Sequence, residues 1–419
     1  MPVLLLGAGL LFSVKLKFFW TAHPVRFFGT LKKGFSGGGQ TPLRAMSMAL
    51  AGTLGVGNIA GVASAVVAGG AGAVFWMWAS ALLAMAVKYA EVALAVSHRR
   101  RGEDGWYGGA MYYIADTVSP VLGGVFAVLC IANSIITGNI LQSNAAASVC
   151  SDAVAPVIVG IVMCVMTLAV TVGPVKRISD VTVRLIPFLS AVYIFLSVGI
   201  IVLNASRLPQ VISDIFTSAF SFRAAAGGVG GYGITRALRF GVSRGILSNE
   251  AGCGTAPTAH ASADTDSPHA QGAFGIFEVF VDTVVICTLT AAVVLLLPDY
   301  GGEDGVRLSV LAYRTFAGNA AGIMIAASVV LFAYATVVCQ SYYGIVALRY
   351  FTKSPAAKTV YLTVFALSCI VGAVIAPPVM WGLADLCVAL MTVLNVCVLL
   401  YLFADRRRRS ELLPGAKNG

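Results

Sequence analysis

The chain has 419 residues, of which 58% are hydrophobic and 11% charged, and its formal net charge is +10. Because a soluble globular protein carries about 25% charged residues, this chain has too few to cover a soluble surface. Its hydrophobicity also excludes a disordered chain. Apolar runs of about 20 residues, the length of a membrane-spanning helix, recur along it, whereas a membrane barrel would show alternating segments of about ten. The composition therefore predicts an all-α polytopic membrane protein.

Eleven apolar segments are predicted to cross the membrane, and the loops between them are too short for another domain. We expect one transmembrane domain over residues 1–404 and a basic cytoplasmic tail over 405–419. The first segment lacks the basic start and the cleavage site of a signal peptide. The segments run over 2–20, 43–70, 71–97, 120–150, 153–173, 185–204, 218–246, 271–298, 318–348, 358–376 and 379–404.

Basic residues predict the orientation. Twenty lysines and arginines fall in the loops and tail on one side of these segments and three on the other. The positive-inside rule then places the N-terminus outside and the C-terminus in the cytoplasm, as for a protein of a prokaryotic inner membrane. The same distribution over short loops argues against nucleic acid as a partner. The nine cysteines form no C-x-x-C pair, which favours reduced thiols over disulfides or a metal site.

Two glycine clusters interrupt apolar segments, at Ala51–Gly61 and Gly227–Gly233. Backbone polar groups at membrane depth are tolerated only against protein or a wet cavity. The clusters lie five segments apart, so that with 2–20 set aside they begin two five-helix halves, 43–204 and 218–404, of opposite orientation. This pattern is typical of inverted-repeat transporters. Close helix packing through small residues is the alternative.

Broken helices of this kind can bind both an anion and a cation. Free N–H groups at the start of a half-helix attract a carboxylate, and freed carbonyl oxygens suit a small cation. Together they predict a site for an amino acid carried with Na⁺ or H⁺. In the second cluster, the candidates for contact with the substrate are Gly230 and Gly231.

Charged residues inside the segments are functional hypotheses, because they are expensive at membrane depth. Lys88 and Glu91 lie three apart on one helix face, which favours a structural pair over a proton relay. Asp282 can pair with an arginine of segment 218–246 or face a cavity. Asp385 can cap a helix, pair or line the transport path.

Uncharged polar residues also gather at helical spacing. Asn139 and Gln142 are three apart and are expected to line the path, with interhelical bonding as the alternative. Thr336 and Gln340 are four apart on one face, and the Thr336 hydroxyl is a candidate cation ligand, with helix packing as the alternative.

Three motif matches lack the context that their chemistry needs. Gly228–Gly233 fits a dinucleotide pattern without a preceding strand, and Gly34–Gly38 fits a nucleophile elbow without a strand-to-helix turn. A cluster of histidines and aspartates matches no defined metal spacing and is expected to be a solvated cytoplasmic loop; it comprises His260, Asp264, Asp266 and His269.

The longest distinctive motif is Gly241-Val-Ser-Arg-Gly-Ile-Leu-Ser-Asn-Glu-Ala-Gly252. With Thr53–Gly61, Gly138–Asn144 and Ser341–Gly344, it resembles the alanine or glycine:cation symporter family of the amino acid–polyamine–organocation superfamily, from roughly residue 40 to 400. The resemblance implies a leucine-transporter-like 5+5 inverted repeat with broken first and sixth core helices and one extra N-terminal helix. It also implies uptake of small neutral amino acids, chiefly alanine and glycine, driven by Na⁺ or H⁺, with no other cofactor.

The resemblance further implies which residues form the site. The substrate carboxylate is expected at the backbone of Gly55, Val56, Gly57 and Asn58, with polar groups facing the ligand at Gly138, Asn139 and Gln142. The cation is expected at carbonyls of the first core helix and at the later Thr-containing helix: Gly52, Thr53, Gly55, Ala335 and Thr336. The oligomeric state stays open.

Four positions depart from the usual family pattern. Val56 replaces Thr, Ala335 replaces Ser, Gln340 replaces Trp and Ile345 replaces Glu. The change at Gln340 enlarges and polarises the pocket and predicts a larger or more polar substrate, such as glutamine or asparagine. The lost Ser predicts altered Na⁺ coupling.

Other classes of protein fit the sequence less well than a transporter. An amino acid sensor without transport is an alternative that the four departures keep open. A channel needs a selectivity filter, and an intramembrane enzyme needs a nucleophile with a base or a metal set. The sequence shows neither.

Overall fold

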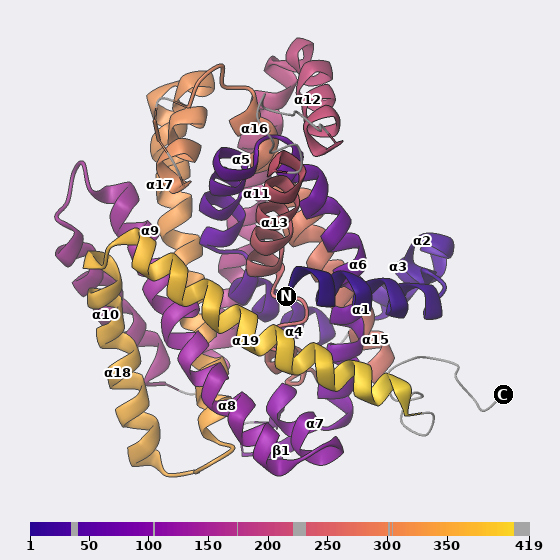
Figure 1. The fold of residues 1–419 in the computed structure, drawn as a ribbon. Coiled ribbons are helices and arrows are strands. Elements are labelled where there is room, and N and C mark those ends of the chain that lie inside the picture. The colour runs from indigo at the N-terminus through magenta and orange to yellow at the C-terminus, as the bar shows by residue number, and fades with distance from the viewer. Residues whose placement is uncertain are drawn as a thin grey trace.

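The structure, a computed structural model, is built almost entirely of helices (Figure 1). It describes residues 1–34, 41–103, 105–173, 175–220, 232–300, 302–303 and 305–405. The predicted tail beyond Asp405, the substrate candidates Gly230 and Gly231, and most of Gly34–Gly38 lie outside these residues.

The elements follow one another along the chain with short connections. Up to residue 203 they are α1 (Pro2–Lys15), α2 (Phe19–Ala22), α3 (Pro24–Lys33), α4 (Pro42–Thr53), η1 (Gly57–Gly61), α5 (Val62–Gly69), α6 (Gly72–Ser97), β1 (Arg100–Gly102), β2 (Gly105–Tyr107), α7 (Ala110–Thr117), α8 (Pro120–Ile135), η2 (Ile136–Ile140), α9 (Leu141–Cys150), α10 (Pro156–Thr171) and α11 (Val175–Leu203). From residue 205 they are η3 (Ala205–Arg207), α12 (Leu208–Phe220), α13 (Tyr232–Asn249), α14 (Pro257–His260), α15 (Pro268–Val279), η4 (Phe280–Cys287), α16 (Thr288–Leu295), α17 (Gly305–Leu348), α18 (Pro355–Val374) and α19 (Pro377–Ala404). The strands β1 and β2 pair as an antiparallel hairpin.

Proline and capping residues in the sequence mark where several helices begin. Proline stands in the first turn of α4, α8, α15 and α18, where its missing N–H has no helical partner to lose. The residue before each of these prolines caps the helix, its hydroxyl accepting a hydrogen bond from a backbone N–H of the first turn. These caps are Thr41, Ser119, Ser267 and Ser354.

The first core helix is broken, as the glycine cluster predicts. The half-helix α4 ends at Thr53, and the chain resumes as η1 and α5 after a bend of 55°. Its central residues are buried, including Thr53, Val56 and Asn58. The break therefore lies inside the bundle, where protein surrounds the interrupted backbone.

Other segments differ from their predicted lengths. Within the described ranges, seven helices are long and apolar enough to span a membrane, or eight if the bent pair is one span. Helix α1 has 14 residues, about 21 Å at the usual rise per residue, and α10 has 16, so both are short for a membrane core of about 30 Å. Of the predicted segment 218–246, residues 221–231 with most of the second glycine cluster lie outside the described residues, and the rest belongs to α12 and α13.

Three spans contain a π-helical stretch at their polar residues. These stretches are η1 with Asn58, η2 with Gly138 and Asn139, and η4 with Asp282. A π-helical turn widens the backbone spiral and is common at functional positions. Periodicity in the sequence cannot distinguish such a turn from regular α-helix, so all three were predicted as plain spans or as a glycine break.

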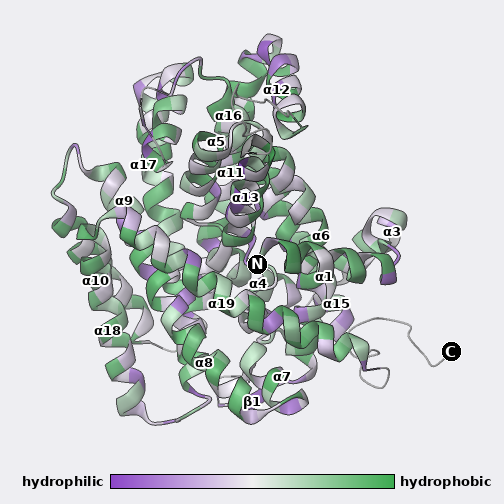
Figure 2. Ribbon diagram, viewed as in Figure 1, coloured by the Kyte–Doolittle hydropathy of each residue, from purple (hydrophilic) through white to green (hydrophobic). Residues whose placement is uncertain are grey.

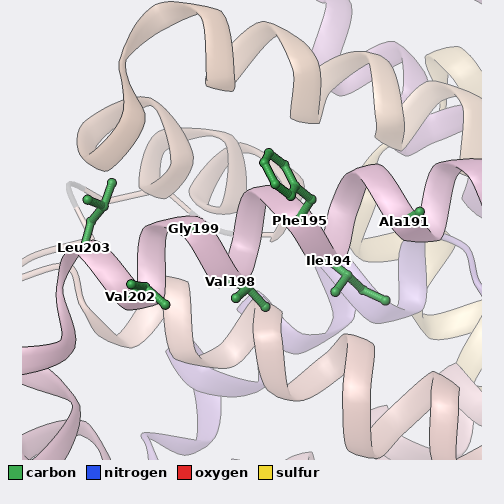
Figure 3. A pocket seen from close by; sticks show the side chains of 7 residues that line it. All are labelled: Ala191, Ile194, Phe195, Val198, Gly199, Val202 and Leu203. Carbon is green, nitrogen blue, oxygen red and sulfur yellow. The ribbon is translucent and has the colours of Figure 1, made fainter.

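Hydrophobic residues are frequent along the ribbons of the long helices in Figure 2, and α18 exposes Val360, Val364 and Leu367. One shallow groove on α11 is lined only by apolar residues (Figure 3). Its Phe195 is 80% exposed. Because all of its lining residues are apolar, this groove offers no polar group for substrate binding. An exposed apolar surface on a membrane-spanning helix is suited to contact with lipid chains. Its lining comprises Ala191, Ile194, Phe195, Val198, Gly199, Val202 and Leu203.

Candidate functional site

At the break between α4 and η1, two backbone N–H groups donate hydrogen bonds to side-chain amide oxygens. The N–H of Gly55 donates to Oδ1 of Asn58 at 3.1 Å. The N–H of Val56 donates to Oε1 of Gln142, in α9, at 3.0 Å. These N–H groups are the ones expected to bind a substrate carboxylate. In this conformation an amide oxygen stands in the place of a carboxylate oxygen at each, so a carboxylate that binds both must displace Gln142 and Asn58.

A threonine from α17 approaches the same break. A Cβ atom added to Gly55 would lie 2.7 Å from Oγ1 of Thr336 and 2.8 Å from Oε1 of Gln142. A side chain at position 55 would therefore press against both oxygens, and one of them would have to move. Thr336 is buried, and its hydroxyl has no hydrogen-bond partner in the described part of the chain. A buried polar atom without a partner is unusual and calls for an explanation such as a ligand.

One turn further along α17, Gln340 connects both halves of the chain. Its Nε2 donates to Oε1 of Glu250 at 3.0 Å and to the carbonyl of Gly52 at 3.4 Å. Its Oε1 is buried and has no partner among the described residues. A Cβ atom on Gly138 would lie 2.4 Å from Cβ of Gln340. The predicted residues Gly52, Gly138 and Gln340 are thus in one place, and Glu250 joins them.

The described partners of Asp282 are neutral side chains, whereas one of its two expected roles was a pair with an arginine of segment 218–246. Its Oδ1 accepts from Nδ2 of Asn58 at 2.7 Å, and its Oδ2 accepts from Ser248 at 2.8 Å. The arginine of this part of α13, Arg244, pairs instead with Asp385 at 2.8 Å. The carboxylate of Asp282 therefore ties the broken helix to η4 and α13, and Asp385 takes the pairing role that was one of its three options.

The expected pair of Lys88 with Glu91 is wrong. Lys88 Nζ lies 3.4 Å from Oε1 of Glu278, in α15. Glu91 instead accepts from the N–H of Gly252 at 3.1 Å and from the amide of Asn395. Helix α15 packs closely along α6. Lys88 and Glu91 therefore each bind a group from another part of the chain, and they do not bind each other.

His260 is also placed differently from the solvated loop that was expected. It is fully buried, and its Nε2 lies 2.8 Å from Oε2 of Glu278. Its Nδ1 lies 2.8 Å from the amide nitrogen of Gln271. Glu278 was not among the predicted residues, although a carboxylate inside an apolar run is the signal that reveals such a residue.

The remaining predicted residues are spread around the break. Thr53 turns its hydroxyl to the carbonyl of Ala49 at 3.3 Å and to Glu278 at 3.4 Å. Asn139 contacts α18, donating to the carbonyl of Phe365, so of the amide pair only Gln142 meets the broken backbone. Ala335 is buried and has no polar side-chain group.

The donors at the break suit an alkali cation better than a transition metal. No group of three or more histidine, cysteine or carboxylate side chains gathers to hold a metal ion in the ranges that the structure describes. The oxygens near Gly55 are instead those of the Thr336 hydroxyl and the Gln142 amide. Hard oxygen donors of this kind are the ligands that hard cations prefer.

Comparison with known proteins identifies the family. Residues 1–409 match the model of the sodium:alanine symporter family. The sodium/alanine symporter AgcS of Methanococcus maripaludis is 35% identical over 96% of this chain and 91% of its own length. The probable sodium/glutamine symporter GlnT of Bacillus subtilis is 33% identical over 96% and 84%.

A solved structure shares the fold. A manganese transporter from Eremococcus coleocola superposes with a TM-score of 0.58 over 90% of this chain and 81% of its own, at 14% identity. At this identity the likeness concerns the fold alone. The family match and the relatives extend over nearly the whole chain, and the predicted family is confirmed. The chain belongs to the sodium:alanine symporter family, whose members are membrane transporters and not enzymes.

Proposed function

We propose that this protein is a secondary active symporter that imports a small neutral amino acid of the alanine and glycine class together with Na⁺. The observation that carries the proposal is the placement of Thr336. Its unpartnered, buried hydroxyl stands at the Gly55 break, where a Cβ atom would be 2.7 Å away. A cation there would be bound by this oxygen and by backbone carbonyls from Gly52 to Gly55.

The substrate would occupy the other side of the break. Its carboxylate would replace the amide oxygens of Asn58 and Gln142 at the N–H groups of Gly55 and Val56. The Gln142 amide thus holds the carboxylate position in the absence of substrate and moves away when substrate binds. Gly57 and Gly138 would line the substrate space, and we propose that Gly230 and Gly231, which lie outside the described residues, also contact the substrate.

The transport cycle that we propose is alternating access in a 5+5 inverted repeat. The halves are 43–204 and 218–404, preceded by α1 as the extra helix, which makes eleven spans in all. The break in α4 and η1 supports the first half. The N-terminus would lie outside and the C-terminus in the cytoplasm of a prokaryotic plasma membrane, as the basic loops predict. Ion and substrate couple only if each binds one state better than the other.

A larger polar substrate, such as glutamine, is the second candidate, and Gln340 favours it. The amide nitrogen of Gln340 is engaged by Glu250 and Gly52, which leaves Oε1 as the group available to a ligand. An acceptor of this kind matches a substrate that carries a donor, such as a side-chain amide. The relatives named for alanine and for glutamine are 35% and 33% identical, so identity does not choose between the two substrates.

Uptake into proteoliposomes tests both candidates. Labelled alanine is offered with and without an inward Na⁺ gradient and competed with glycine, glutamine and serine. Na⁺-driven uptake blocked by glycine supports the first proposal, and Na⁺-driven uptake of glutamine without alanine supports the second. Uptake driven by a proton gradient alone would show that the coupling ion is H⁺ and not Na⁺. Binding of either amino acid without any uptake would overturn both proposals in favour of a sensor.

A further inference from the structure

A basic cavity of about 690 Å³ lies away from the broken helix. One wall is the hairpin of β1 and β2, and the other is the connection from α17 to α18, at the same end of the bundle (Figure 1). Among the described residues of its lining, the cationic side chains outnumber the acidic ones by four to one. The cations are Arg101, Arg349, Lys353 and Lys358, and the acid is Glu103.

The cations converge from distant parts of the chain. Arg101 belongs to the hairpin, whereas Lys353 and Lys358 lie about 250 residues later, around the start of α18. The guanidinium of Arg349 lies 5.4 Å over the ring of Tyr107, which holds it at the cavity wall. Like charges held in one hollow repel one another and focus the field inside it. The fold therefore holds a concentrated positive charge that an anion would stabilise.

The shape and position of the cavity indicate the class of anion. Lysine and arginine together favour a phosphate group, because arginine offers a planar fork and lysine a compact charge. The wall also includes Leu348, the last residue of α17, and Pro355, the first of α18, so the cavity lies where two apolar helices end. Basic hollows between such helix ends are suited to anionic lipid headgroups.

We propose that this cavity binds the phosphate of an anionic phospholipid headgroup. The same chemistry would accept free inorganic phosphate, and position at the helix ends favours the lipid. The site does not depend on which amino acid is transported. Because α17 carries both Thr336 and Gln340, a lipid bound here contacts the helix that also reaches the broken backbone.

Thermal unfolding of the purified full chain in neutral detergent tests the proposal. Short-chain phosphatidylglycerol, phosphatidylcholine and inorganic phosphate are added separately, and bound lipid is counted by native mass spectrometry. Phosphatidylglycerol should raise the melting temperature by about 2 °C or more at saturation, and phosphatidylcholine should not. The double variant Lys353→Gln, Lys358→Gln should lose both the shift and the bound lipid.

Two matched variants separate the site from general charge. Lys353→Arg, Lys358→Arg keeps the charge and should keep the shift. Lys15→Gln, Lys17→Gln removes two exposed charges outside the cavity and should also keep it. A shift that survives the Lys353→Gln, Lys358→Gln change, or no shift with any anion, would overturn the site. An equal shift with inorganic phosphate and no retained lipid would overturn the lipid assignment.

Discussion

Lys88 and Glu278 form an ion pair at 3.4 Å although 190 residues separate them along the chain. Both side chains are buried, and His260 holds the second oxygen of Glu278 at 2.8 Å. Thr53, the last residue before the broken backbone, also reaches Glu278. The pair therefore connects the half-helix α4 to α6, α14 and α15.

Removing one member of this pair should destabilise the protein strongly. Lys88→Met leaves the buried Glu278 carboxylate with His260 and the hydroxyl of Thr53 but without its lysine, and loss of one partner of a buried pair costs about 3–5 kcal/mol. The double change Lys88→Met, Glu278→Met should recover much of that loss, because no unpaired charge remains. Thermal unfolding in detergent checks both. Equal stability of the single and double variants would show that the unpaired carboxylate is not what destabilises the single variant.

Gly55→Ala should abolish uptake. The added methyl group would meet Oγ1 of Thr336 at 2.7 Å and Oε1 of Gln142 at 2.8 Å, so these side chains must move and the proposed cation and substrate positions are disturbed. Gly382→Ala is the matched control, because nothing lies within 4 Å of its Cβ position. Uptake rates of the two variants at equal amounts of folded protein decide the matter, and normal uptake by Gly55→Ala would contradict the proposed site.

Thr336→Ala should weaken the dependence on Na⁺ more than the recognition of substrate. A hydrogen bond or ligand to a charge contributes about 1.5–3 kcal/mol, so the Na⁺ concentration for half-maximal uptake should rise roughly tenfold or more. Thr336→Ser keeps the hydroxyl and should stay near the parent value. Equal losses in Na⁺ dependence and in substrate competition would count against a cation ligand at this position.

Gln340→Trp should shift the substrate ranking from glutamine toward alanine. The larger apolar ring would fill the space beside Gly138 and remove the amide that contacts Gly52 and Glu250. Competition of labelled substrate by unlabelled alanine and glutamine measures the ranking. An unchanged ranking would show that Gln340 serves to hold Glu250 and does not select the substrate.

Much of the arrangement at the candidate site was predictable from glycines and polar residues at helical spacing. The break at Gly55 and its neighbours Gln142 and Thr336 were all expected, and the structure brings them within contact of one another. Glycine signals a close approach because it alone lacks a Cβ atom. Asn139 was expected beside Gln142 and faces α18 instead, since the π-helical turn η2 changes which residues share a face.

The sequence by itself determined the membrane class, the family and the place of the first break, because composition, hydrophobic length and glycine position act locally along the chain. Only the tertiary structure decided that Lys88 pairs with Glu278, that His260 is buried and that Gln340 reaches Glu250. Each of these contacts joins helices far apart in sequence. A buried charge pairs with whichever opposite group the packed helices bring closest, and spacing within one helix contains no information about that group.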